Sequence, residues 1–280
     1  MTFNDEEVSK ADVTNSLLND EVVTDADQAT EIVENAWVEL GRRAELASNL
    51  TPYSVGSRRL VRVRSWEKVP ENAFCILLSA ACLYTFRAYD RGLVTYEAQG
   101  RLFESLTAES LSSWGWSVAP TGWGKDNPAK LEERLLPLTD SIRERPGGNR
   151  GEYIPKASKD GGLDILLSRT FGDDWCGRPV YLVQCASGWD WENKLATPSI
   201  GLWCKLVDFP SPPQRALAFP FAVREVGMRK ITNAYGGLLL DRFRILRARR
   251  DGPVSFSPGL REALARWMPP LVDEILALTR

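Results

Sequence analysis

The chain has 280 residues, of which 44% are hydrophobic and 26% are charged, a composition typical of a globular protein with one large domain or two. It contains no histidine, which excludes Ser-His-Asp triads, Cys-His dyads and histidine-ligated zinc sites, because each needs an imidazole as base or ligand. The first 40 residues hold 11 acidic side chains and one lysine, whereas the remaining 240 hold 34 basic and 26 acidic side chains, so a basic body follows an acidic leader.

The N-terminal third is predicted to be an arm followed by helices. Residues 1–25 are acidic and without strong periodicity, which predicts a flexible arm. A helical extension is predicted over 26–93. Within it, apolar residues recur at helical spacing over 27–46, residues 51–66 alternate as an extended segment with arginines on one face, and the apolar stretch 72–88 predicts a buried helix.

Residues 94–280 are predicted to form a second domain in which helices and strands alternate. A helix beginning at Tyr96 runs into a strand marked by Gly115, and a Gly-rich basic loop precedes two apolar strands. Interleaved helices and strands predict an α/β fold with an N-terminal helical extension. The later elements expected are strands over 163–169, 179–187 and 238–241, and helices over 127–145, 241–250 and 257–280.

The cysteines and the apolar runs bear on the compartment. The five cysteines are odd in number and show neither a C-x-x-C pair nor zinc-site spacing, so reduced thiols are the better interpretation. The first residues lack the basic and apolar regions of a signal peptide, and no apolar run reaches the roughly 18 residues that a membrane span needs. We therefore expect a cytoplasmic protein without a membrane segment.

Two polar residues interrupt the apolar pattern of adjacent predicted strands. Asp164 stands near the start of the first strand, and Gln184, twenty positions later, near the end of the next. A buried polar group without a partner costs roughly 1–3 kcal/mol, so these side chains should find partners or coordinate something. Mg²⁺ prefers oxygen ligands, and two such residues on neighbouring strands would supply half of its site.

The context of this pair resembles the PD-(D/E)XK nuclease superfamily, in which an Asp on one strand, and an acidic residue or Gln on the next, hold a divalent metal. The resemblance covers roughly residues 95–250 and implies a restriction-endonuclease-like central mixed sheet flanked by helices. A longer pattern resembles uncharacterised bacterial members of the superfamily, many of which look like defence nucleases. It consists of Gln184, Cys185, Ser187, Gly188, Trp191 and Lys194, followed downstream by Leu239, Asp241, Arg242, Arg244 and Ile245.

The resemblance implies a Mg²⁺- or Mn²⁺-dependent nuclease with Asp164 and Gln184 as metal ligands. The lysine of the superfamily usually stands two positions after the Gln, where this chain has Ala186. That lysine is also found on the following helix, where Lys194 is the candidate.

A third ligand is expected from an upstream helix, which in this fold usually contributes a Glu. Glu104 is the candidate, because Gly100 and Ala108 flank it on one helical face and let the backbone approach the sheet. The alternative is a surface Glu beside a packing stripe.

Basic residues outside this site favour a polyanionic partner, because phosphate contacts release counterions. We expect Arg242, Arg244 and Lys159 to contact nucleic acid, and solvation of a surface is the alternative explanation for their charges. The resemblance favours DNA over RNA, in anti-phage defence or DNA processing. It is also compatible with a partner protein, such as an ATPase or a helicase, and with a homo-oligomer.

Two other functions stay open on the sequence. Ala186 and the neutral Gln184 favour a catalytically inactive protein of the same fold that binds DNA or a partner protein. The uneven charge favours a structural subunit whose basic face meets an acidic protein and whose acidic arm regulates docking.

Overall fold

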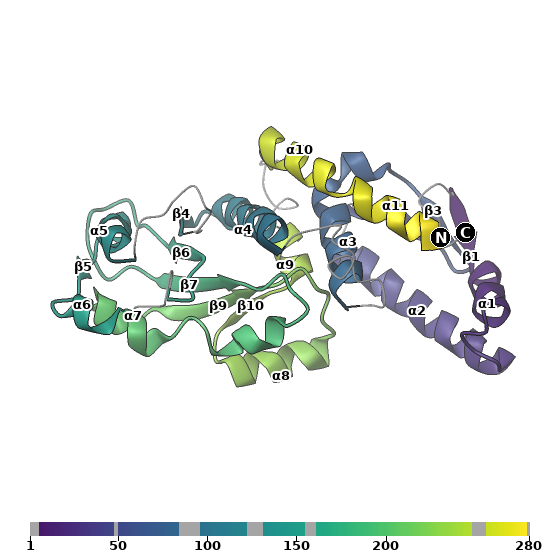
Figure 1. The fold of residues 1–280 in the computed structure, drawn as a ribbon, viewed down its shortest axis with the longest axis horizontal. Coiled ribbons are helices and arrows are strands. Elements are labelled where there is room, and N and C mark those ends of the chain that lie inside the picture. The colour runs from purple at the N-terminus through teal and green to yellow at the C-terminus, as the bar shows by residue number, and fades with distance from the viewer. Residues whose placement is uncertain are drawn as a thin grey trace. The chain divides into compact units, whose positions relative to one another are not determined.

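The chain forms two compact units. The computed structural model describes residues 6–47, 50–83, 96–121, 131–154, 161–247 and 256–278. One unit comprises Met1–Leu77 with Arg261–Arg280, and the other comprises Leu78–Leu260 (Figure 1). In the described ranges no helix combines the length and apolar character needed to cross a lipid bilayer.

The first unit combines a small antiparallel sheet with helices. Its strand order is β1-β3-β2. Helix α2 buries Val33 and Trp37 against Leu60 of β3, which confirms the amphipathic helix predicted over 27–46. The elements are β1 (Glu7–Ser9), α1 (Lys10–Asn19), α2 (Ala26–Ala47), β2 (Tyr53–Val55), β3 (Arg59–Arg62), a 3-10 helix η2 (Trp66–Lys68), α3 (Pro70–Leu83), α10 (Pro258–Trp267) and α11 (Pro269–Leu278), with the unit boundaries inside α3 and α10.

The segment predicted as a flexible arm contains a strand and a helix instead. Strand β1 pairs with β3, and the Arg59 guanidinium lies 2.5 Å from the Glu7 carboxylate. The hydroxyl of Ser9 accepts a hydrogen bond from Asp12 N, and the Asp12 carboxylate accepts one from Ser9 N. This reciprocal pair is a capping box, which starts α1 directly after β1. The acidic composition concealed that local signal, and the long-range pairing with β3 cannot be inferred from composition.

The C-terminal helices also differ from expectation, because they belong to the first unit and not to the predicted second domain over 94–280. The Arg261 guanidinium donates to Lys68 O at 2.9 Å and lies 3.6 Å from the buried Glu71 carboxylate. The rings of Phe74 and Trp267 meet edge to face with centroids 4.8 Å apart. These contacts join α10 to α3, elements almost 200 residues apart in sequence.

The second unit contains a five-stranded mixed sheet in the order β10-β9-β7-β6-β4. Strands β4 and β6 are antiparallel to their neighbours, whereas β7, β9 and β10 run parallel. Its elements are α4 (Tyr96–Ser113), β4 (Ser117–Pro120), α5 (Leu131–Ile142), β5 (Arg145–Pro146), α6 (Arg150–Tyr153), β6 (Ile165–Ser168), β7 (Val180–Cys185), a 3-10 helix η3 (Trp191–Ala196), α7 (Ile200–Leu206), β8 (Val207–Asp208), β9 (Gln214–Ala218), α8 (Glu225–Tyr235), β10 (Leu238–Leu240) and α9 (Arg242–Arg247).

The parallel strands are joined by helical crossovers, as parallel pairing requires. η3 and α7 connect β7 to β9, and α8 connects β9 to β10 (Figure 1). Helices α5 and α7 bury a shared core against β6 and β7, and α4 packs beside β7 and β4. The predicted α/β class with a central mixed sheet flanked by helices is therefore confirmed.

Candidate functional site

Asp164 directly precedes strand β6, and Gln184 lies near the end of the neighbouring antiparallel strand β7. Asp164 N donates to Val183 O at 3.0 Å, which holds the start of β6 against β7. The Gln184 amide Nε2 donates to Asp164 Oδ2, and the two residues are only 6% and 8% exposed. The sequence analysis expected these polar side chains to find partners or to coordinate something, and in the structure they are hydrogen-bonded to each other.

The Asp164 carboxylate is held by a second donor, Cys185 N, at 2.6 Å from Oδ2. Two donors on one oxygen orient the whole carboxylate and fix its position in the sheet. In this arrangement Gln184 positions Asp164 through its nitrogen.

The turn that leads into Asp164 depends on two glycines. Gly161 and Gly162 have φ of 61° and 73°, the left-handed region that glycine adopts without steric cost. The indole of Trp203 donates to Gly161 O at 3.2 Å. A Cβ on Gly162 would lie 3.1 Å from Thr197 Cβ and 3.5 Å from Gln184 Oε1. The turn is therefore packed directly against the Asp164–Gln184 pair.

A Gly162→Ala substitution should destabilise the fold more than Gly177→Ala does. Both positions have positive φ, which costs a non-glycine residue roughly 1–2 kcal/mol. Nothing lies within 4 Å of a Cβ at Gly177. The Cβ of an alanine at position 162 would press on Thr197, which adds about 1 kcal/mol or more to the loss of stability. Urea unfolding of both variants measures the difference, and equal losses would contradict the close packing.

Lys194, on η3, extends its side chain to the end of β7, beside the residue that follows Gln184. Its ammonium Nζ donates to Cys185 O at 3.1 Å. Trp191, at the start of η3, is buried and stacks on Phe219 with centroids 4.9 Å apart, which anchors this short helix to the sheet. Ala186, at the position where the superfamily's lysine is usual, is fully buried. The structure therefore places Lys194 in the lining of the same pocket as Asp164.

Glu104 lies on α4 and lines a pocket of about 600 Å³ together with Asp164 and Lys194. Gly100 and Glu97, one turn and two turns earlier on α4, line it as well, which fits the predicted helical face. The complete lining is Glu97, Gln99, Gly100, Arg101, Glu104, Asp164, Cys185, Ser187, Gly188, Trp189, Asp190 and Lys194.

The Cys185 thiol is unsuited to nucleophilic catalysis. Burial, followed by the negative charges of Asp164 and Glu104, raises its pKa well above the usual value. A buried neutral thiol is a small apolar group.

Four carboxylates line the pocket, and two of them, those of Glu104 and Asp164, are the metal ligands expected from the sequence. Among the described residues, no group of three or more His, Cys, Asp or Glu side chains could hold a metal ion. Mg²⁺, however, is typically bound by one or two carboxylates and keeps several waters. Glu104 and Asp164 fit that donor set by type and number.

Of the expected nucleic-acid contacts, Arg242 is not placed on a surface. It is 5% exposed, and its guanidinium lies over the ring of Phe243 at 5.1 Å. Arg244 is exposed, but one guanidinium nitrogen donates to Leu239 O at 2.7 Å. Asp241, the residue before α9, accepts a hydrogen bond from Arg244 N, and Arg242 is the buried first residue of that helix. Lys159 lies outside the described residues.

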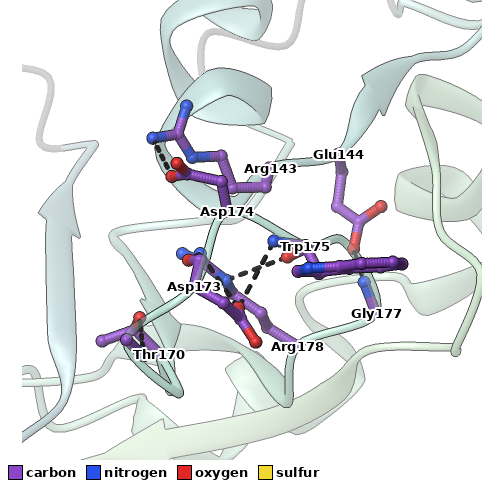
Figure 2. A network of polar contacts seen from close by, with 9 residues as sticks. Arg143, Glu144, Thr170, Asp173, Asp174, Trp175, Gly177 and Arg178 are labelled. Atoms are coloured by element: carbon purple, nitrogen blue, oxygen red, sulfur yellow. Dashed lines mark hydrogen bonds and ion pairs between the residues drawn. The ribbon is translucent and has the colours of Figure 1, made fainter.

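A second pocket of about 550 Å³ lies at the loop between β6 and β7. Its polar groups bind one another: Arg143 pairs with Asp174 at 2.6 Å, and Gly177 N donates to Glu144 at 2.8 Å (Figure 2). Burial raises the pKa of the Glu144 carboxyl, and the hydrogen bond from Gly177 N offsets part of that rise. This network fixes the loop, and Trp175 protrudes from it with 78% of its surface exposed.

Sequence reasoning missed several residues of the first pocket. Arg101 was not singled out, although it follows Gly100 on the predicted helix, and the support that Trp203 gives to the Gly161–Gly162 turn has no local signal. Family models, curated proteins and solved structures were all compared with this chain, and none of them matches it.

Proposed function

We propose that the chain is a metal-dependent nuclease that hydrolyses phosphodiester bonds of DNA. The observation that carries this proposal is one pocket lined by Glu104, Asp164 and Lys194. Phosphodiester hydrolysis needs a nucleophilic water, neutralisation of phosphate charge and stabilisation of the leaving oxygen. Carboxylates able to hold a divalent cation beside an ammonium group meet these needs without histidine.

The strand arrangement supports a restriction-endonuclease-like core in the second unit. The resemblance calls for an Asp on one strand and an acidic residue or Gln on the next, and Asp164, directly before β6, is hydrogen-bonded to Gln184 of β7. It also allows the lysine to come from the element after the second strand, which is where η3 carries Lys194.

Each side chain has a distinct part in the proposed reaction. Asp164 and Glu104 supply the negative charge that holds Mg²⁺ or Mn²⁺. Gln184 and Cys185 N keep the Asp164 carboxylate in one orientation. The Lys194 ammonium stabilises charge that develops on the phosphate. When bound, the cation neutralises phosphate charge and lowers the pKa of water.

The test is cleavage by the full-length chain of supercoiled plasmid, linear duplex and single-stranded DNA. Millimolar Mg²⁺ or Mn²⁺ should give cleavage products, and excess EDTA should abolish them. The proposal fails if none of the three substrates is cut with either metal.

A catalytically inactive nucleic-acid-binding protein is the second candidate. Two observations favour it: Ala186 is buried where a lysine is usual, and Gln184 brings no negative charge to the site. That function predicts salt-dependent DNA binding, unaffected by EDTA and never followed by cleavage.

A further inference from the structure

Trp189 stands out among the residues of the pocket that Glu104, Asp164 and Lys194 line. Its side chain is 63% exposed, and it lines the pocket from the turn between β7 and η3. Within the described part of the chain its ring has no recorded aromatic or hydrogen-bonding partner. A large flat side chain left exposed beside a polar pocket is suited to bind a ligand with a flat face.

The turn that carries Trp189 is anchored at both ends. Before it, Ser187 O accepts hydrogen bonds from Gln99 Nε2 at 3.4 Å and from Cys82 Sγ at 3.5 Å. After it, Trp191 is buried against Phe219. The indole of Trp189 is therefore presented from a fixed turn, which lowers the entropy lost when a ligand stacks on it.

The charge of the pocket favours stacking over electrostatic attraction as the source of affinity. Its acidic members are Glu97, Glu104, Asp164 and Asp190, and its basic members are Arg101 and Lys194. Without a bound cation this lining does not attract a polyanion. A nucleotide therefore needs an interaction that does not depend on charge, such as stacking, to bind here.

Arg101 supplies one place for a phosphate in the same pocket. Its guanidinium lies 3.4 Å from the Glu97 carboxylate, and both side chains are about half exposed. Exposed ion pairs of this kind contribute little to stability, so Arg101 can exchange its partner for a phosphate oxygen at small cost.

From these features we propose that Trp189 stacks on an unpaired base, so that the pocket takes single-stranded DNA or a frayed end in preference to an intact duplex. In a duplex both faces of each base are covered by neighbouring bases, and exposing one requires unstacking. A single strand offers its bases without that cost. This inference rests on the proposed nuclease function, which supplies nucleic acid as the ligand.

The experiment measures binding in EDTA, where no metal-dependent cleavage occurs, by fluorescence anisotropy of labelled oligothymidylate and of a duplex of equal length. The full-length chain is compared with Trp189→Ala, Trp189→Phe and the control Trp175→Ala, which removes a still more exposed indole from the β6–β7 loop. Thermal melting checks that each variant is folded.

We expect wild type to bind the single strand more tightly than the duplex. Trp189→Ala should weaken single-strand binding about tenfold, with little change in its salt dependence, because stacking is uncharged. Trp189→Phe should retain most of the affinity, and Trp175→Ala should stay within about twofold of wild type. Equal losses for Trp189→Ala and Trp175→Ala, or equal binding of single strand and duplex, would overturn the inference.

Two further outcomes separate this inference from the nuclease proposal. If DNA affinity depends on Trp189 but the protein cuts no DNA, the stacking site stands and the nuclease proposal is refuted. If the protein cleaves DNA with metal but its DNA affinity does not depend on Trp189, the nuclease proposal stands and the stacking site is refuted. Tighter binding of oligouridylate than of oligothymidylate would overturn DNA as the ligand.

Discussion

Asp164→Asn should reduce metal-dependent DNA cleavage by about 1,000-fold or more while DNA affinity in EDTA stays within about threefold of wild type. The substitution removes one of the two carboxylates proposed to hold the metal and keeps the shape of the side chain. With Glu104 as the one proposed carboxylate ligand left, cation affinity falls, and the charge on the phosphate is no longer offset. Each tenfold in rate corresponds to about 1.4 kcal/mol of transition-state stabilisation, so this loss is about 4 kcal/mol.

The control for this variant is Asp174→Asn, which changes an aspartate of the other pocket that is 85% exposed at its side chain. It should leave cleavage unchanged. Thermal melting is needed for Asp164→Asn, because the carboxylate accepts from Gln184 and from Cys185 N inside the sheet. Cleavage by Asp164→Asn at a rate near wild type, in a folded protein, would refute the assignment of the site.

Local patterns predicted the central part of the fold. The two strands around Asp164 and Gln184 were found from apolar runs, and the helix beginning at Tyr96 from its spacing, because these signals depend on near neighbours along the chain. Pairings between distant segments could not be read in that way. The joining of β1 to β3, and of α10 to α3, depends on contacts between elements far apart in sequence.

The candidate site, like the fold, could be predicted only in the part that depends on local sequence. Asp164 and Gln184 were predictable because polar residues in apolar strands carry a cost that demands a partner. That Glu104 would line the same pocket depends on α4 packing beside β7, which only the folded chain shows. Arg242 was misjudged for the opposite reason: a charged residue in a basic run was expected at the surface, but it is the first residue of α9 and is buried there.

Lys194→Met should lower the cleavage rate about 100-fold and leave DNA affinity within about threefold of wild type. Methionine keeps the length of the side chain and removes the ammonium group, whose loss from a preorganised charge-stabilising position typically costs 10²–10³ in rate. Lys194→Arg keeps the charge and should recover part of the activity, because its planar head fits a lysine site imperfectly.

The matched control is Lys205→Met, which removes an exposed lysine of α7 that lies over the ring of Tyr153 at 4.5 Å. Its cleavage rate should equal that of wild type. The Lys194 ammonium also donates to Cys185 O, so Lys194→Met should cost about 1 kcal/mol of stability in a urea titration. A variant that loses stability but cleaves at the wild-type rate would show that Lys194 only supports the end of β7. Loss of activity with partial rescue by Lys194→Arg would show that the positive charge itself takes part, and that the chain supplies from η3 the lysine that Ala186 cannot provide.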